Sequence, residues 1–96
     1  MKAKLLLKFK RTDTLGNVME IVVWSVRGDT RYPEAVKYRL AYIPYGRRAP
    51  VVLFDNHYPK GHHKHVDGRQ ETYPYMSIAG LIDDFKAHAQ SWGDKE

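Results

Sequence analysis

Apolar and polar residues alternate with a period of two along most of the chain, which is the spacing of half-buried β-strands. From residue 2 to residue 10, apolar residues at odd positions alternate mainly with lysines, so we expect one buried face and one solvated face. Residues 18–26 are apolar on both sides over their middle, which predicts a central strand. Further strands are expected over residues 36–45, 51–56, 62–66 and 69–73, the last two joined by a tight turn at Asp67-Gly68.

The apolar spacing becomes helical after Pro74. Ser77 is a candidate N-cap and Gly93 a natural end of this helix. Between them one apolar stripe is expected, formed by Ile78, Leu81, Ile82, Phe85, Ala89 and Trp92. The prediction is an α+β fold in a single domain over residues 1–96. It consists of an antiparallel β-sheet meander of about five to six strands, with one C-terminal amphipathic helix packed on one face.

Charge and composition narrow the classes of function. The formal net charge of +5 favours a polyanion such as nucleic acid, or an acidic protein, as the partner. The absence of cysteine excludes disulfides and thiolate zinc sites. No apolar run approaches the roughly 18 residues of a membrane span. Because Lys8 interrupts the first apolar run, we expect neither a signal segment nor a membrane protein, and a cytoplasmic location is predicted.

Residues 55–66, DNHYPKGHHKHV, contain four of the five histidines. A simple hairpin with its turn at residues 58–61 pairs His57 with His62 and Asp55 with Lys64. On this register Asn56, His63 and His65 share the opposite face of the strands. A slip of one residue would change the grouping. With either register, two or three imidazoles are expected to lie close together.

Three interpretations of this segment are open. As a metal site it would use Asp55, His57, His63 and His65, but alternation divides these donors between two faces, so neither a metal nor another cofactor is predicted. As a catalytic site it would cleave RNA without metal. One neutral imidazole would take a proton from the 2′-hydroxyl, and a protonated imidazole or a tyrosine would give one to the leaving oxygen. As a solvated basic turn it would have no chemistry, and Tyr58-Pro59 with Gly61 is typical of such turns.

The catalytic interpretation assigns three groups of residues. The acid and base candidates are His62, His63 and His65. The cations expected to contact phosphate are Lys60, Lys64 and Arg69. The supporting residues are Asp55, Asn56 and Gly61. Four aromatic residues are more typical of core or half-buried packing than of base stacking, because they lie at alternating strand positions: Trp24, Tyr38, Tyr42 and Tyr45.

Several segments occur in an order and spacing that resemble the TumE family of toxin–antitoxin proteins. They are Lys4-Leu5-Leu6, residues 20–24 (EIVVW), residues 37–42 (KYRLAY), Phe54-Asp55-Asn56, residues 60–65 (KGHHKH) and the helix at residues 77–92. The resemblance covers nearly the whole chain. It implies a small cytoplasmic toxin that is neutralised by a cognate antitoxin with a helix-turn-helix DNA-binding domain. It assigns no catalytic residue, but Asp55, Asn56, Lys60, Gly61, His63 and His65 match the family's characteristic segment.

The leading hypothesis is therefore a toxin that acts on RNA, as a metal-independent endoribonuclease with His63 and His65 as acid and base. The alternative is a non-catalytic binding module for a protein partner or nucleic acid. Its basic sheet face would comprise Lys2, Lys4, Lys8, Lys10, Lys37 and Arg39. A sheet edge at the first strand or the last hairpin would also allow two copies to pair as a homodimer.

Overall fold

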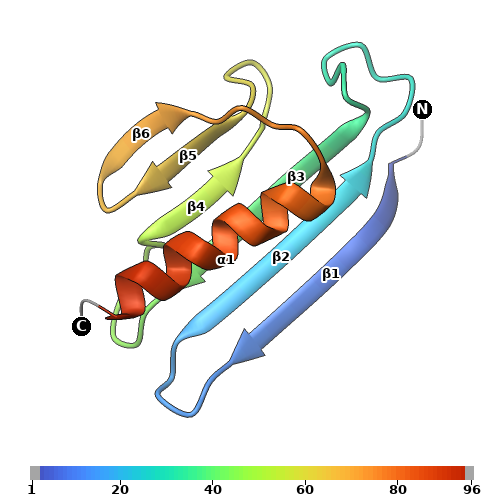
Figure 1. The fold of residues 1–96 in the computed structure, drawn as a ribbon. Coiled ribbons are helices and arrows are strands. Elements are labelled where there is room, and N and C mark those ends of the chain that lie inside the picture. Colours follow the sequence, from blue (N-terminus) through green and yellow to red (C-terminus); the bar gives the residue numbers. More distant parts are fainter. Residues whose placement is uncertain (1–2, 95–96) are drawn as a thin grey trace.

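The computed structural model describes residues 3–94, which form one six-stranded antiparallel sheet and one helix (Figure 1). The strands lie side by side in chain order from β1 to β6. Their bounds are β1 Lys4–Thr12, β2 Val18–Ser25, β3 Val36–Ile43, β4 Val52–Asp55, β5 His63–Val66 and β6 Arg69–Thr72; the helix α1 is Ile78–Asp94. The predicted meander with a C-terminal helix is confirmed. Lys2, the predicted start of the first strand, lies outside the described residues.

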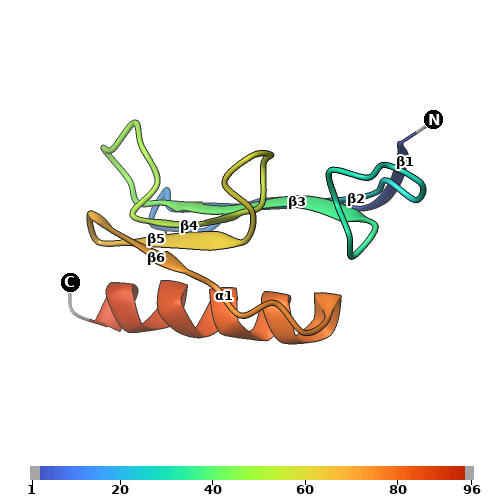
Figure 2. The same cartoon turned by 90° about the horizontal axis from the view of Figure 1, so that it is seen from above.

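The helix forms a second layer on one side of the sheet (Figure 2). We call that side of the sheet the helix face and the other side the open face. The backbone N–H of Gly80 donates to Ser77 Oγ at 3.0 Å, so Ser77 caps the helix as predicted. The helix continues through Gly93 to Asp94. Figure 2 also shows that the β3–β4 and β4–β5 connections rise on the open side.

The core lies between α1 and the helix face of the central strands. The register aligns Ile21, Leu40 and Phe54 across β2, β3 and β4, and all three are buried. From the helix, Phe85 meets Phe54 edge-on with ring centroids 5.9 Å apart. The alternation of strands β2 to β4 therefore builds one apolar layer against the helical stripe, as the sequence predicted.

β1 does not have the predicted half-buried face, because all nine of its residues are exposed. α1 packs on β3 and β4. A helix is only about 10 Å wide, and strands are spaced about 4.8 Å apart, so one helix leaves the outer strands uncovered. The expected common face of Leu5 and Leu7 is also wrong. A bulge between them sets Leu5 opposite Trp24 and Leu7 opposite Val23, which lie on different faces.

Candidate functional site

The pairing of β4 with β5 decides which histidines share a face. Asp55 lies opposite His63, not opposite Lys64 as predicted, so the expected register is wrong by one residue. Lys64 instead lies opposite the core residue Phe54, on the helix face. Because side chains alternate along a strand, His63 and His65 lie with Asp55 on the open face. The predicted site is therefore divided between two faces of the sheet.

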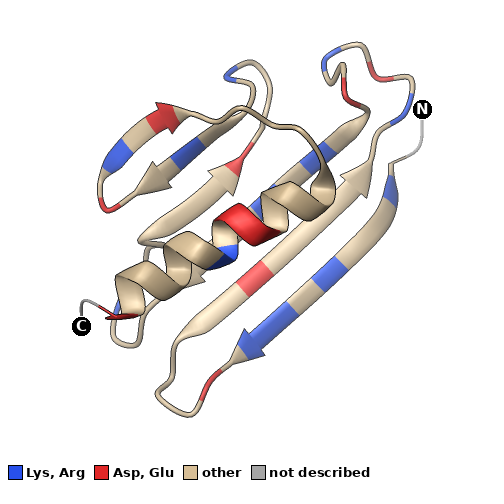
Figure 3. Ribbon diagram, viewed as in Figure 1, with Lys and Arg blue, Asp and Glu red and all other residues tan. Residues whose placement is uncertain are grey.

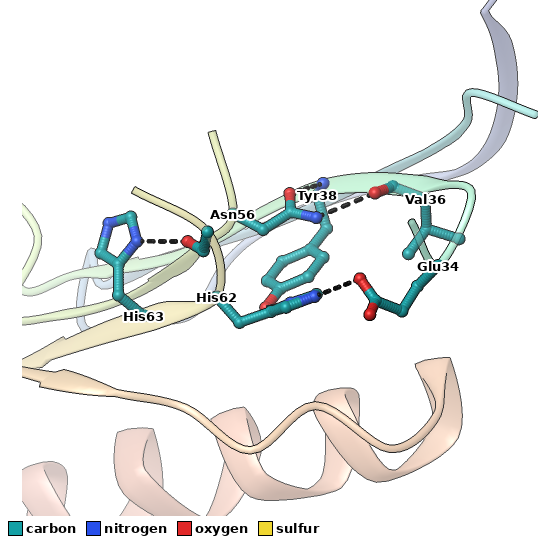
Figure 4. Close-up of polar contacts among 7 residues, drawn as sticks. Glu34, Val36, Tyr38, Asn56, His62 and His63 are labelled. Carbon is teal, nitrogen blue, oxygen red and sulfur yellow. Dashed lines mark hydrogen bonds and ion pairs between the residues drawn. The ribbon is translucent and has the colours of Figure 1, made fainter. Parts of the chain in front are cut away.

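Asn56 fixes the end of β4 against β3. Its side chain is buried; Oδ1 accepts the backbone N–H of Tyr38 at 2.9 Å, and Nδ2 donates to the carbonyl of Val36 at 2.8 Å (Figure 4). These bonds replace the ladder bonds that the departing chain no longer makes. Asn56, predicted as a supporting residue, thus positions the start of the histidine segment.

His62 lies on the helix face, and its ring points away from that of His63 (Figure 4). It stacks on both Tyr38 and Tyr75, with centroid distances of 5.6 and 4.8 Å, and the two tyrosine rings also stack on each other at 5.8 Å. Nε2 donates to Glu34 Oε1 at 2.7 Å, since a carboxylate only accepts, and this bond lowers the pKa of Glu34. Nδ1 is hydrogen-bonded to the Tyr38 hydroxyl at 2.8 Å. Both ring nitrogens are therefore engaged, so we assign His62 to packing.

Two of the three predicted phosphate ligands lie away from His63 and His65. Lys64 Nζ is 3.3 Å from Nε2 of His88 on α1, and 3.9 Å from Glu71 Oε2. Burial, followed by the charge of Lys64, lowers the pKa of His88. Arg69 lies opposite Val66, which pairs in turn with the core residue Val52, so Arg69 is also on the helix face of the ladder. Lys60 remains the predicted cation closest to the open-face histidines.

His63 and His65 form an edge-to-face pair on the open face, with ring centroids 5.2 Å apart. His63 is only 6% exposed, and its Nδ1–H donates to the carbonyl of Gly61 at 2.8 Å. This bond occupies Nδ1 and leaves Nε2 as the second ring nitrogen. Within residues 3–94 Nε2 makes no hydrogen bond, and no buried side-chain polar atom lacks a partner, so Nε2 reaches the surface.

The surroundings of His65 favour its neutral form. Desolvation lowers its pKa below 6.5, and the positive charges of His63 and Lys60 add to the shift, while Asp55 opposes it. Lys60 extends along the same face, where its ammonium donates to Gln70 Oε1 at 3.3 Å. At pH 7 the imidazole of His65 is therefore neutral and able to accept a proton.

We expect stability to fall as the pH drops from about 6.5 towards 5. The pKa values of His65 and His88 are both depressed, so the unfolded chain binds more protons than the folded chain in this window. The stabilisation is thus complete above pH 6.5 and is lost as the pH falls through the folded pKa values. Urea denaturation of wild type and of His65→Gln/His88→Gln at pH 7.5 and pH 5 tests this. A wild type that loses no more stability than the variant would contradict it.

A hollow of about 320 Å³ lies on the open face, and Asp55, which lines it, lies opposite His63 in the ladder. It is lined by Trp24 of β2, by Lys37 and Arg39 of β3, and by Asp55 and His57. Trp24 is 37% exposed, so its indole is partly open to solvent. Tyr45 is exposed as well, whereas Tyr38 and Tyr42 are buried as expected. The cross-strand pairs Trp24–Lys37 and Arg39–Asp55 assemble the hollow from three strands, which spacing along the chain did not reveal.

The open face also brings together the donors that alternation was expected to separate. Asp55, His63 and His65 share this face. Even so, no three His, Asp or Glu side chains within residues 3–94 are placed to hold a metal ion. In the same part of the chain, no helix has the length and apolar character needed to cross a membrane.

Fold and site define a small basic α+β domain with paired imidazoles and a cation-lined hollow on the open face of its sheet. The family model described as Toxin TumE matches residues 3–92. The match spans almost the entire chain, so the protein belongs to the Toxin TumE family, as the resemblance implied. It is accordingly the toxin of a toxin–antitoxin system, with a cognate antitoxin as its partner. No curated protein and no solved structure matches the chain.

Proposed function

We propose that this toxin acts on RNA as a metal-independent endoribonuclease, with His63 and His65 as its acid and base. The observation that carries the proposal is the pairing of these two imidazoles, 5.2 Å apart, on the face that also holds the cation-lined hollow. Two proton-transfer groups within reach of one phosphodiester are what cleavage through the 2′-hydroxyl requires.

In the proposed reaction the neutral imidazole of His65 takes the proton of a ribose 2′-hydroxyl. The 2′-oxygen attacks the adjacent phosphorus, and the bond from phosphorus to the 5′-oxygen breaks. His63, protonated at Nε2, gives its proton to that leaving oxygen. The Lys60 ammonium stabilises the negative charge on the phosphorane. The products are a 2′,3′-cyclic phosphate and a 5′-hydroxyl, and water is not consumed in this step.

The hollow would hold the RNA next to the histidine pair. An exposed indole such as that of Trp24 is suited to stacking on an unpaired base. Lys37 and Arg39 supply cations for the flanking phosphates. Asp55 lines the same hollow and lies opposite His63 in the ladder, so an RNA strand that crosses the open face from Trp24 on β2 to β5 would pass Asp55 and reach the two imidazoles.

Charge reversal in the hollow tests the RNA surface. Lys37→Glu/Arg39→Glu is expected to weaken binding of a single-stranded RNA more than tenfold, measured by fluorescence anisotropy. The slope of log affinity against log salt should become shallower by about 1.4, because each phosphate contact contributes roughly 0.7 on single strands. Arg69→Glu/Lys86→Glu makes the same net change on the helix side and serves as the control. Equal losses in both variants would mean that only total charge matters.

We also propose that the cognate antitoxin carries a helix-turn-helix DNA-binding domain and that the toxin acts in the cytoplasm, where its RNA substrate is found. The alternative is a basic module that binds nucleic acid or a protein without cleaving it. If the alternative holds, Lys37→Glu/Arg39→Glu abolishes toxicity, whereas replacement of the histidines does not.

A further inference from the structure

β1 is an edge strand that exposes apolar side chains as well as an unpaired backbone edge. Within residues 3–94 it pairs only with β2, at one end of the sheet order. Its large exposed apolar residues are Leu5 (43%), Leu6 (48%), Leu7 (37%) and Phe9 (39%). An exposed apolar edge invites the pairing of another chain. Such a patch in a folded protein marks an interaction site.

The apolar residues nearest the core lie on the helix face. Leu7 lies opposite Val23, and Phe9 opposite Ile21, so both extend the apolar layer beyond the helix. A hollow of about 170 Å³ continues this face at the end of the strand, lined in part by Arg11, Met19 and Tyr42. A further strand at this edge could therefore cover Leu7 and Phe9 with its own apolar side chains.

All charged side chains of β1 are positive. Its nine residues include the four cations Lys4, Lys8, Lys10 and Arg11 and no carboxylate. Lys8 and Lys10 face the open side, opposite Val22 and Glu20. Figure 3 shows this succession of basic positions along the edge strand.

This charge argues against a second copy at the edge. Pairing β1 with β1 would bring four cations against four others, and like charges on facing strands are destabilising. A strand that carries acidic residues opposite Lys8 and Lys10 would gain from the same contacts. The homodimer expected from an open edge is thus disfavoured here.

We propose that β1 is the docking edge for the cognate antitoxin. An extended segment of the antitoxin, alternating apolar with acidic residues, would add to the sheet beside β1. Its apolar side chains would cover Leu7 and Phe9, and its carboxylates would meet Lys8 and Lys10. This mode of recognition combines backbone hydrogen bonds with contacts to alternate side chains. The proposal rests on the partner that the family implies and does not depend on RNA cleavage.

Binding of the purified cognate antitoxin, measured by calorimetry, tests the proposal. We expect Lys8→Glu/Lys10→Glu and, separately, Leu7→Ser/Phe9→Ser to weaken binding at least tenfold. Arg69→Glu/Lys86→Glu, with the same charge change as the lysine variant, should bind like wild type. Because the replaced β1 side chains are exposed, circular dichroism should show an unchanged fold in both β1 variants. Wild-type affinity in both β1 variants would overturn the proposal.

Hydrogen–deuterium exchange locates the contact independently of the variants. On complex formation, amides in residues 4–12 should become protected, together with an antitoxin segment that alternates apolar and acidic residues. Protection confined to other parts of the toxin would overturn the proposal. A free toxin that is already dimeric and protected over residues 4–12 would also overturn it, because the occupant would then be a second copy. RNA cleavage is not read out in either experiment, so failure of the proposed function would leave these results unchanged.

Discussion

Expression of the His63→Ala/His65→Ala variant is expected to leave bacterial growth unaffected, whereas the wild-type toxin arrests it. The two imidazoles share the open face at a centroid distance of 5.2 Å, and each has a proton-transfer role in the proposed reaction. A positioned acid or base typically contributes 10²–10⁴-fold to a rate. Loss of both should reduce RNA cleavage by at least 10³-fold, which is enough to remove toxicity.

The comparison requires matched levels of soluble protein. His88→Gln is a suitable control, because it alters a histidine on α1, across the sheet from the proposed site. It should arrest growth like wild type. If the double variant still arrests growth at matched levels, the histidines are bystanders, and the basic open face with Lys37 and Arg39 becomes the source of toxicity.

The second large effect is on stability. Phe85→Ala is expected to reduce the free energy of unfolding by about 3–5 kcal/mol, because it removes a fully buried ring and leaves a cavity against Phe54. A domain of this size has only about 5–15 kcal/mol in total, so the variant should be close to unfolding at 37 °C. Urea denaturation at 25 °C measures the change.

Phe9→Ala provides the matched control for the loss of a phenyl ring. Phe9 is 39% exposed on the uncovered part of the helix face, so its loss should cost far less than that of Phe85. Equal losses in the two variants would show that β1 is covered in the free protein. Such a result would contradict the exposed edge described above.

The fold was predictable because its local patterns are strong. The double-sided apolar run of β2, the alternation of β3 and the Asp67-Gly68 turn all correspond to elements of the sheet, and the positive φ at both turn residues explains the choice of Asp and Gly there. The stripe that includes Leu81, Phe85 and Ala89 faces the core as expected. Because the connections between strands are short, consecutive strands are expected to be neighbours, which predicts a meander.

The grouping of the site residues was not predictable in the same way. A shift of one residue in the register of a hairpin moves every side chain to the opposite face of the sheet. Here the register is set by contacts between residues that are distant in sequence. Asn56 bonds to the backbone of β3, and His62 packs against Tyr38 and Tyr75. These contacts turn Lys64 to the helix face and His63 to the open face. The exposure of β1 likewise depends on the position of the helix over the sheet. The alternation of apolar and polar residues within β1 gives no information about that position.

The most direct test of the central claim is cleavage of a single-stranded RNA by the purified toxin in the presence of EDTA. An oligonucleotide of the same base sequence that lacks the 2′-hydroxyl at every position serves as the comparison. We expect that only the RNA is cut, that the products end in 2′,3′-cyclic phosphate and 5′-hydroxyl, and that His63→Ala/His65→Ala cuts neither. Cleavage of both oligonucleotides, or of RNA by the double variant at the wild-type rate, would contradict it.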